Sequence, residues 1–122
     1  MMRVLIDTSI WVDHFRKTTP LLKTLLEEDH VVIHPFIIGE LACGSLGNRT
    51  EILELLALLP PCHQADFEEI LSLIHSKKLY GKGIGFVDVG LVASSLLTQS
   101  LLWTADKRLN KVASDLKIQF PR

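Results

Sequence analysis

Three short apolar runs restrict the possible folds of this chain more than any other feature of its sequence. They lie at residues 3–7, 30–34 and 101–105 and read RVLID, HVVIH and LLWTA. The middle of each run is apolar throughout rather than alternating, as expected of strands that are buried on both faces. Because helical patterns separate the runs, they predict an α/β fold with a parallel sheet.

The segments between the runs show apolar residues at helical spacing. Helices are predicted over residues 9–15, 20–29, 36–46, 50–59, 65–79, 89–98 and 106–116, and Phe67 is among the positions predicted to point inward. A last short strand is predicted at residues 117–120. No repeat, low-complexity tract or linker interrupts this order, so residues 1–122 are predicted to form a single domain.

Composition narrows the class of protein further. The chain has 48% hydrophobic residues, which predicts a well-filled core. No apolar run approaches the roughly 20 residues of a membrane-spanning helix, and no secretory leader precedes Val4. We therefore expect a cytoplasmic protein without a membrane partner.

Cys43 and Cys62 lack metal-ligand spacing and are predicted to be buried or half-buried thiols. The five histidines form no HxxxH or HxH pair, which argues against zinc.

Four acidic residues stand where an α/β fold gathers ligands. Asp7 ends the first strand, Asp106 follows the LLWTA strand, and Asp88 stands at the start of a helix with many small residues. Glu40 lies in the helix that follows the second strand. Strand ends and helix starts meet at one rim of a parallel sheet, where such folds bind ligands.

Each acid also has a purely structural interpretation. Asp7, Asp88 and Asp106 all stand where an N-cap residue would accept hydrogen bonds from free helix amides. Glu40 taken alone would be a solvated helix residue. Four carboxylates at one rim, however, repel one another by up to ~4 kcal/mol per pair at about 4 Å. A divalent cation would relieve that repulsion, and oxygen-only ligands favour Mg²⁺ or Mn²⁺. Carboxylate-held Mg²⁺ is typical of phosphodiester hydrolysis, in which the metal activates water and stabilises the transition state.

Four motifs resemble a known family in order and spacing. They are VLIDTSIWVDHFR, IGELACG, GIGFVDVGLVASSLL and LLWTADKRLNKVA, and they are distributed between residues 4 and 113, so the resemblance covers nearly the whole chain. They resemble the PIN-domain ribonucleases, and most closely the VapC-type toxins of bacterial type II toxin–antitoxin systems. The resemblance implies a three-layer α/β/α domain with a central parallel sheet of four or five strands. It also implies that Asp7, Glu40 and Asp88 hold a metal, with Asp106 as the fourth acid.

The resemblance further implies how the site works. Asp106 would bind a second metal or orient a water, and hydroxyl side chains would support the acids from Thr8, Ser9 and Thr104. The implied activity is endonucleolytic cleavage of RNA with Mg²⁺, for which Mn²⁺ substitutes. The implied partners are a small VapB-type antitoxin and a second copy of the chain, in a heterotetramer or larger assembly. His14 is expected to be a surface or interface residue rather than a catalytic one.

Basic residues flank the predicted site. The net charge is −1, but setting the four acids aside leaves 13 basic and 10 acidic residues, a balance of +3. Two clusters stand near the acids in the sequence: Lys77, Lys78 and Lys82, then Lys107, Arg108 and Lys111. They would steer phosphates towards the site, or they complement helix dipoles and keep the surface hydrated. Tyr80 and Phe86 are candidates for stacking on an unpaired base, although Phe86 is also a candidate core residue.

Other families with a strand that ends in Asp fit less well. A haloacid-dehalogenase-type phosphatase needs a second Asp where this chain has Ser9. A response-regulator receiver needs an earlier acidic pair and a late Lys after a strand, and a Rossmann domain needs GxGxxG after the first strand. All these features are missing. The alternative from another class is a PIN fold that no longer cuts and acts as an RNA-binding or protein-docking module.

Overall fold

The computed structural model describes residues 2–121 and places three strands and seven helices in them. The strands are β1 (Val4–Ile6), β2 (Val31–Val32) and β3 (Leu101–Trp103). The helices are α1 (Thr8–Arg16), α2 (Pro20–Glu27), α3 (Pro35–Cys43), α4 (Arg49–Ala57), α5 (Phe67–Ser76), α6 (Phe86–Thr98) and α7 (Lys107–Asp115). The sheet is entirely parallel, in the order β2-β1-β3. This arrangement confirms the α/β class and the parallel sheet.

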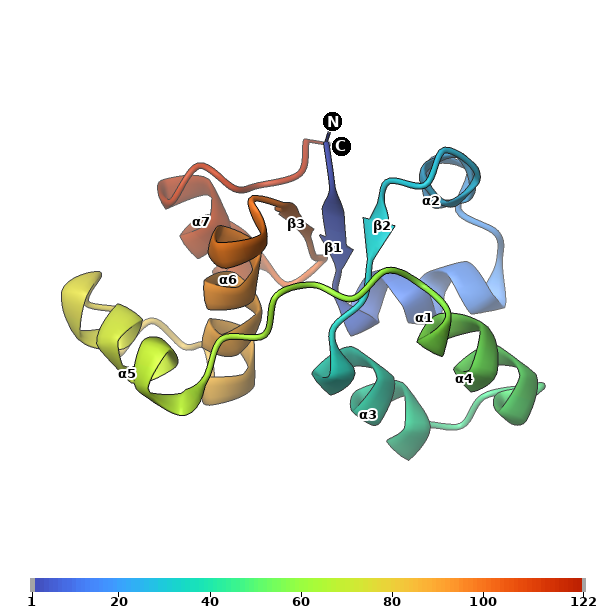
Figure 1. The fold of residues 1–122 in the computed structure, drawn as a ribbon, viewed down its shortest axis with the longest axis horizontal. Helices are drawn as coiled ribbons and strands as arrows, with labels where there is room; N and C mark the ends of the chain where they lie inside the picture. The colour runs from blue at the N-terminus through green and yellow to red at the C-terminus, as the bar shows by residue number, and fades with distance from the viewer. Residues whose placement is uncertain (1, 122) are drawn as a thin grey trace.

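Helices flank the strands on both sides. In Figure 1, α1 to α4 lie on one side of β1 and α5 to α7 on the other, with α6 and α7 next to β3. None of the helices within residues 2–121 is long and apolar enough to cross a membrane. Because the sheet is parallel, the carboxyl ends of the three strands lie at the same edge, between the two groups of helices. The loops that follow β1 and β3 start at this edge.

The prediction of four or five strands was wrong for the part of the chain that the structure describes. Near the C-terminus only Gln119 pairs, in a single bridge to Leu102, and at the other edge Ile33 bridges to Pro61. The backbone at Lys117 is left-handed, with φ 62°, so the extended segment begins too late to form a ladder. At that edge Ile33 N donates to Pro60 O and Cys62 N donates to Ile33 O, and the next ladder bonds would need amide hydrogens that Pro60 and Pro35 lack.

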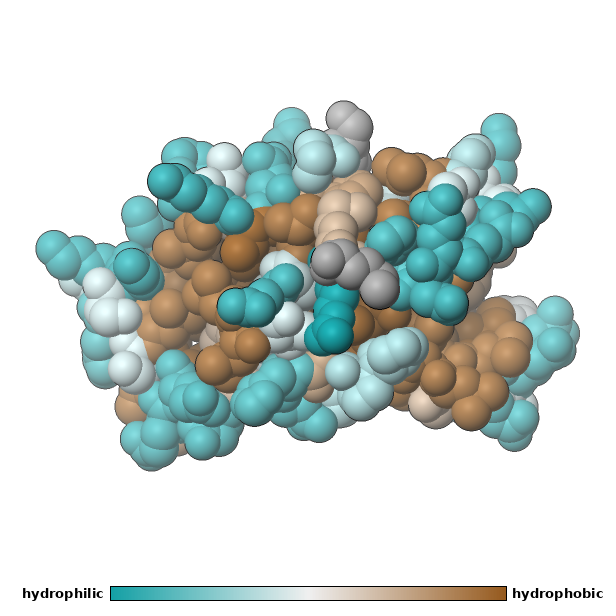
Figure 2. Space-filling view, turned by 45° about the horizontal axis from the view of Figure 1, so that its top comes forward, coloured by the Kyte–Doolittle hydropathy of each residue, from teal (hydrophilic) through white to brown (hydrophobic). Residues whose placement is uncertain are grey.

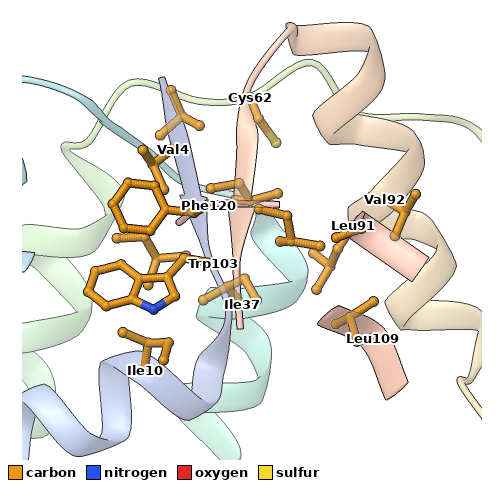
Figure 3. Packing of buried hydrophobic residues seen from close by; sticks show 14 of the residues in the cluster. Val4, Ile10, Ile37, Cys62, Leu91, Val92, Trp103, Leu109 and Phe120 are labelled. Carbon is orange, nitrogen blue, oxygen red and sulfur yellow. The ribbon is translucent and has the colours of Figure 1, made fainter. Parts of the chain in front are cut away.

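Apolar side chains fill the space on both sides of the strands. Figure 3 shows Trp103 and Phe120 on one side and Leu91 and Val92 on the other. The rings of Trp103 and Phe120 lie 4.9 Å apart between centroids. β1 is fully buried along its length, as its unbroken apolar sequence predicted. This packing holds β1 at the centre of the sheet. It therefore also fixes the position of Asp7, the residue that directly follows β1.

Phe67 and Phe86 are both exposed. The prediction that Phe67 points inward was therefore wrong, and so was the core alternative for Phe86. They have exposed fractions of 59% and 43%, and their ring centroids lie 5.6 Å apart. Each is the first residue of its helix, α5 or α6. Asp66 caps α5 by accepting a hydrogen bond from Glu69 N, so the helix begins two residues later than predicted and Phe67 turns outward.

The two cysteines differ in their environment. Cys62 is buried, and this burial raises the pKa of its thiol to about 11. Cys43 is exposed at the last residue of α3, so the prediction that both thiols are at least half-buried was wrong for it. Helix α3 ends there rather than at residue 46, because the backbone at Gly44 is extended.

Candidate active site

Asp7 is held where β1 becomes α1. Its backbone N donates to Trp103 O at 2.9 Å, continuing the register that pairs Ile6 with Trp103. Its side chain is the N-cap of α1, with Oδ1 accepting a 2.8 Å hydrogen bond from Thr8 N. The residue is only 8% exposed. The capping role predicted for Asp7 is therefore present, and Oδ2 is left for other partners.

Hydroxyl groups from two segments meet that second oxygen. Thr104 Oγ1 donates to Asp7 Oδ2 at 2.7 Å, and Ser9 Oγ lies 3.5 Å from the same atom. Thr104 Oγ1 also accepts from Asp106 N at 3.0 Å, and Ser9 Oγ accepts from Ala105 N at 3.2 Å. The end of β1 and the loop after β3 are thus joined by side chains, and Asp7 is fixed in orientation.

Glu40 reaches the same region from α3, which packs against α1. Thr8 Oγ1 donates a 2.6 Å hydrogen bond to Glu40 Oε1. Both residues line a surface cavity of about 350 Å³.

Asp106 is the N-cap of α7, and its Oδ1 accepts hydrogen bonds from Arg108 N and Leu109 N. The predicted cap at Asp106 is therefore also present.

Asp88 differs from the predicted cap. Helix α6 begins at Phe86, so Asp88 is its third residue, and its Oδ2 accepts a 3.4 Å hydrogen bond from Gly85 N. The pKa of Asp88 is raised, first by burial and then by the negative charges of Asp7, Asp106 and Glu40, against the opposing effect of the Gly85 hydrogen bond. Asp88 thus lies within electrostatic range of all three other acids.

The acidic cluster, defined as Asp7, Glu40, Asp88 and Asp106, offers only oxygen ligands. Among residues 2–121 no Lys or Arg forms an ion pair with any of them. In the same residues no three acidic, His or Cys side chains form a ready-made metal-binding group. Mg²⁺ keeps several waters and takes one or two carboxylates directly, and the oxygen-only donors of the acidic cluster are the kind of ligand that Mg²⁺ and Mn²⁺ prefer.

The predicted basic residues separate into two places. Lys82, Lys107 and Arg108 line one surface groove together with Lys111. Lys77 is the C-cap of α5 and Lys78 follows it in a left-handed conformation, and neither lines this groove. The groove of the first group, which also includes Val112 and Asp115 in its lining, is called the basic groove.

Two histidines have local structural roles. His34 is the N-cap of α3, with Nδ1 accepting from Phe36 N at 2.9 Å, and burial lowers its pKa. The His-Pro pair in the sequence was the available signal for this cap. His14 Nδ1 accepts from Thr19 N at 3.0 Å, and burial also lowers its pKa. His14 thus holds the turn between α1 and α2.

Comparisons with known proteins agree with this geometry. The chain matches the PIN domain family over residues 4–115. It is 39% identical over 113 residues to Ribonuclease VapC32 of Mycobacterium tuberculosis strain CDC 1551 / Oshkosh, covering 92% of this chain and 91% of that protein. The protein of the same name from strain H37Rv gives the same values. The chain therefore belongs to the PIN-domain family.

Proposed function

We propose that this protein is a metal-dependent endoribonuclease and the toxin of a type II toxin–antitoxin pair. The observation that carries the proposal is the convergence of the four acids: Thr104 links Asp7 to the backbone of Asp106, and Thr8, next to Asp7, binds Glu40. Asp88 belongs to the same group, because burial first and then the charges of Asp7, Asp106 and Glu40 raise its pKa. Four acids from four separate segments share one neighbourhood, and the chain supplies no cation to balance them among residues 2–121. Such a cluster is suited to a divalent metal and a phosphate substrate.

Each acid has a distinct place in the proposed site. Asp7, Glu40 and Asp88 hold the metal, and Asp106 holds a second metal or orients a water. When bound, Mg²⁺ or Mn²⁺ would activate water and stabilise negative charge at the phosphate. Thr104 and Ser9 keep Asp7 in one orientation, and Thr8 does the same for Glu40. Hydroxyl groups that orient ligands in this way tune the activity of metal sites.

Similarity to a protein named Ribonuclease VapC32 supports RNA as the substrate. Because the two chains are 39% identical over most of their lengths, we propose that this protein catalyses the same class of reaction. RNA as substrate would place the activity in the cytoplasm. The alternative, a PIN-domain protein that binds RNA or another protein without cutting, predicts binding with no metal-dependent cleavage, so one assay separates the two.

Cleavage of bacterial RNA by the purified protein tests the proposal. We expect cleavage with Mg²⁺ or Mn²⁺ and none in EDTA, and a loss of roughly ten- to a hundredfold in Asp106→Asn. Asp66→Asn is the matched control because Asp66 is also a helix N-cap, at α5 rather than at the acidic cluster. Asn caps helices about as well as Asp. Cleavage that persists in EDTA, or an equal loss in both variants, would contradict the metal site.

Apolar surface supports a protein partner, which we propose to be a small VapB-type antitoxin. A cavity of about 370 Å³ between α1, α2 and α4 is lined by Trp11, Phe15, Leu26 and side chains of α4. On α4, Leu55 and the adjoining Leu58 are 57% and 80% exposed. Figure 2 shows apolar surface on the right, the side on which Figure 1 places α4. Co-expression with its VapB-type antitoxin should give a stable complex and relieve growth arrest, and Leu55→Glu should prevent both.

A second copy of the chain is also proposed as a partner. Phe67 and Phe86 form an exposed aromatic pair on the α5–α6 side, away from the cavity at α4. Light scattering should show a dimer that Phe67→Glu dissociates. With antitoxin bound, a heterotetramer or larger assembly is expected. A wild-type monomer at all concentrations would contradict the dimer without affecting the proposed cleavage activity.

A further inference from the structure

The basic groove has a volume of about 360 Å³ and is lined by Lys82, Lys107, Arg108 and Lys111, together with Val112 and Asp115. Lys111 Nζ lies 3.2 Å from Asp115 Oδ1, so its charge is partly balanced. Within residues 2–121, no carboxylate lies within 4.0 Å of the charged nitrogens of Lys82, Lys107 or Arg108. Three cations without acidic partners therefore share one hollow.

The Arg108 side chain rests on the backbone of Gly83. A Cβ built on Gly83 would come 2.7 Å from Arg108 Cδ and 2.8 Å from its Nη1. Gly83 also has φ +78°, a conformation that residues with a side chain rarely adopt. Glycine at this position thus lets the arginine lie flat against the loop. A long, mobile side chain is restricted before any ligand arrives, which reduces the entropy lost on binding.

The same loop and helix connect the basic groove to the acidic cluster. Gly85 N, two residues beyond Gly83, donates to Asp88 Oδ2 at 3.4 Å. Arg108 N donates to Asp106 Oδ1 at 2.9 Å. Arg108 therefore adjoins one acid through its own backbone and a second through the glycine loop. A phosphate bound by its guanidinium would lie beside the acids rather than at a distant surface.

We propose that the basic groove is a binding site for the phosphates of single-stranded RNA next to the cleaved bond, with Arg108 as its main contact and Gly83 as the residue that positions Arg108. The choice of RNA rests on the proposed function. A guanidinium binds phosphate oxygens through two parallel hydrogen bonds, whereas Lys82 and Lys107 act as point charges. Lys77 and Lys78 lie outside the groove and are assigned no part in it.

Binding of a fluorescent, single-stranded oligouridylate of about 12 nucleotides to the metal-free protein in EDTA tests this site. Arg108→Gln should weaken binding on the order of tenfold at low salt and make the slope of log K against log[salt] shallower by about 0.7. Lys77→Gln removes the same charge outside the groove and should leave both quantities unchanged. Equal effects of the two variants, or wild-type binding by Arg108→Gln, would overturn the proposal.

A pair of glycine variants tests the positioning role without changing charge. Gly83→Ala and Gly81→Ala both place a side chain at a positive φ, +78° and +69°, but a Cβ on Gly81 meets open space. Thermal unfolding should therefore show similar losses of stability. Only Gly83→Ala should displace Arg108 and weaken RNA binding several-fold. Equal binding by the two variants would overturn the role of Gly83.

The binding experiment tests the RNA site independently of the proposed function, because it requires neither a metal nor cleavage. Binding through Arg108 without any metal-dependent cleavage by the wild type would remove the proposed function and support the RNA site. Cleavage by the wild type together with unchanged RNA binding and cleavage in Arg108→Gln would support the function and overturn the RNA site.

Discussion

The buried hydroxyl of Thr104 donates a 2.7 Å hydrogen bond to Oδ2 of Asp7, although the two residues lie 97 positions apart. Thr104 Oγ1 also accepts from Asp106 N at 3.0 Å. One side chain thus links the end of β1 to the loop after β3. It fixes the least exposed acid of the cluster and the backbone of another at the same time.

Replacing this hydroxyl with a methyl group should affect stability and cleavage together. Thr104→Val keeps the shape of the side chain but leaves Asp7 Oδ2 with only the 3.5 Å contact to Ser9 Oγ and leaves Asp106 N without its partner. We expect a loss of about 1–3 kcal/mol in the free energy of unfolding and on the order of tenfold or more in cleavage rate. Thr104→Ser restores the hydroxyl and should recover most of both. Urea unfolding and cleavage assays measure them, and normal cleavage by the valine variant would contradict the role.

Thr8 offers a separate test of Glu40. Its hydroxyl donates to Glu40 Oε1 at 2.6 Å near the surface, where the bond contributes little to stability. Thr8→Val should therefore lower cleavage about tenfold with almost no change in melting temperature. Thr24→Val, an exposed threonine on α2, is the control and should leave cleavage unchanged. Full activity in Thr8→Val would show that Glu40 does not need this bond.

Local sequence rules succeeded where the determining contacts are local. Asp7 and Asp106 were predicted as helix caps because each follows an apolar run and precedes a helical pattern, and both cap their helices. Asp88 was misplaced by three residues because α6 begins after Gly85, which has no side chain to mark a cap. The strand count failed for a related reason, since apolar residues at 117–120 show no sign that Lys117 turns left-handed.

Contacts between distant segments were predictable only where the sheet determines them. The parallel sheet and the rule for strand ends bring Asp7 and Asp106 together, and the register of β1 with β3 then aligns Asp7 with Thr104. Nothing in the sequence indicates that Arg108 rests on Gly83, because the contact depends on how the glycine loop folds over α7. The division of the lysines between the groove and the rest of the surface depends on the same loop.

The raised pKa of Asp88 predicts a stabilising substitution. Burial and the three neighbouring acids raise this pKa above its usual value of 3.8. A group with a raised folded-state pKa contributes stability that is complete below the unfolded pKa and is lost as pH rises through the folded one. The charged form of Asp88 thus weakens the fold at pH 7. Asp88→Asn removes this charge and keeps an acceptor for Gly85 N, so it should raise the melting temperature in EDTA by a few degrees.

The pH and metal dependence distinguish this effect from a general change in packing. The gain in Asp88→Asn should disappear below pH 3.8, where the wild-type carboxyl is also neutral, and it should shrink in Mg²⁺ if the cation stabilises the wild type. Asp13→Asn changes an exposed aspartate of α1 and should leave the melting temperature unchanged. A wild type that melts above Asp88→Asn at pH 7 in EDTA would show that the acids do not repel one another.

The cap of α3 makes stability sensitive to mild acid. His34 Nδ1 accepts from Phe36 N, the residue is 1% exposed, and the centroids of its ring and the Phe36 ring lie 4.5 Å apart. Burial lowers the pKa of His34 from 6.5, so the folded chain resists a proton that the unfolded chain accepts. The free energy of unfolding should therefore be greatest above pH 6.5 and fall as the pH approaches the lowered value. Protonation turns Nδ1 into a donor, so Phe36 N at the start of α3 loses its acceptor.

His34→Asn tests this directly, because Asn is a good N-cap that does not titrate. The variant should be less stable at pH 7, where it leaves space in the core, yet its free energy of unfolding should change less between pH 7 and pH 5 than that of the wild type. A residual slope is expected because burial also lowers the pKa of His14. His75→Asn, at an exposed position of α5, should keep the wild-type slope. Denaturant titrations at several pH values measure the slopes, and equal slopes for His34→Asn and the wild type would exclude His34 as the source of the acid sensitivity.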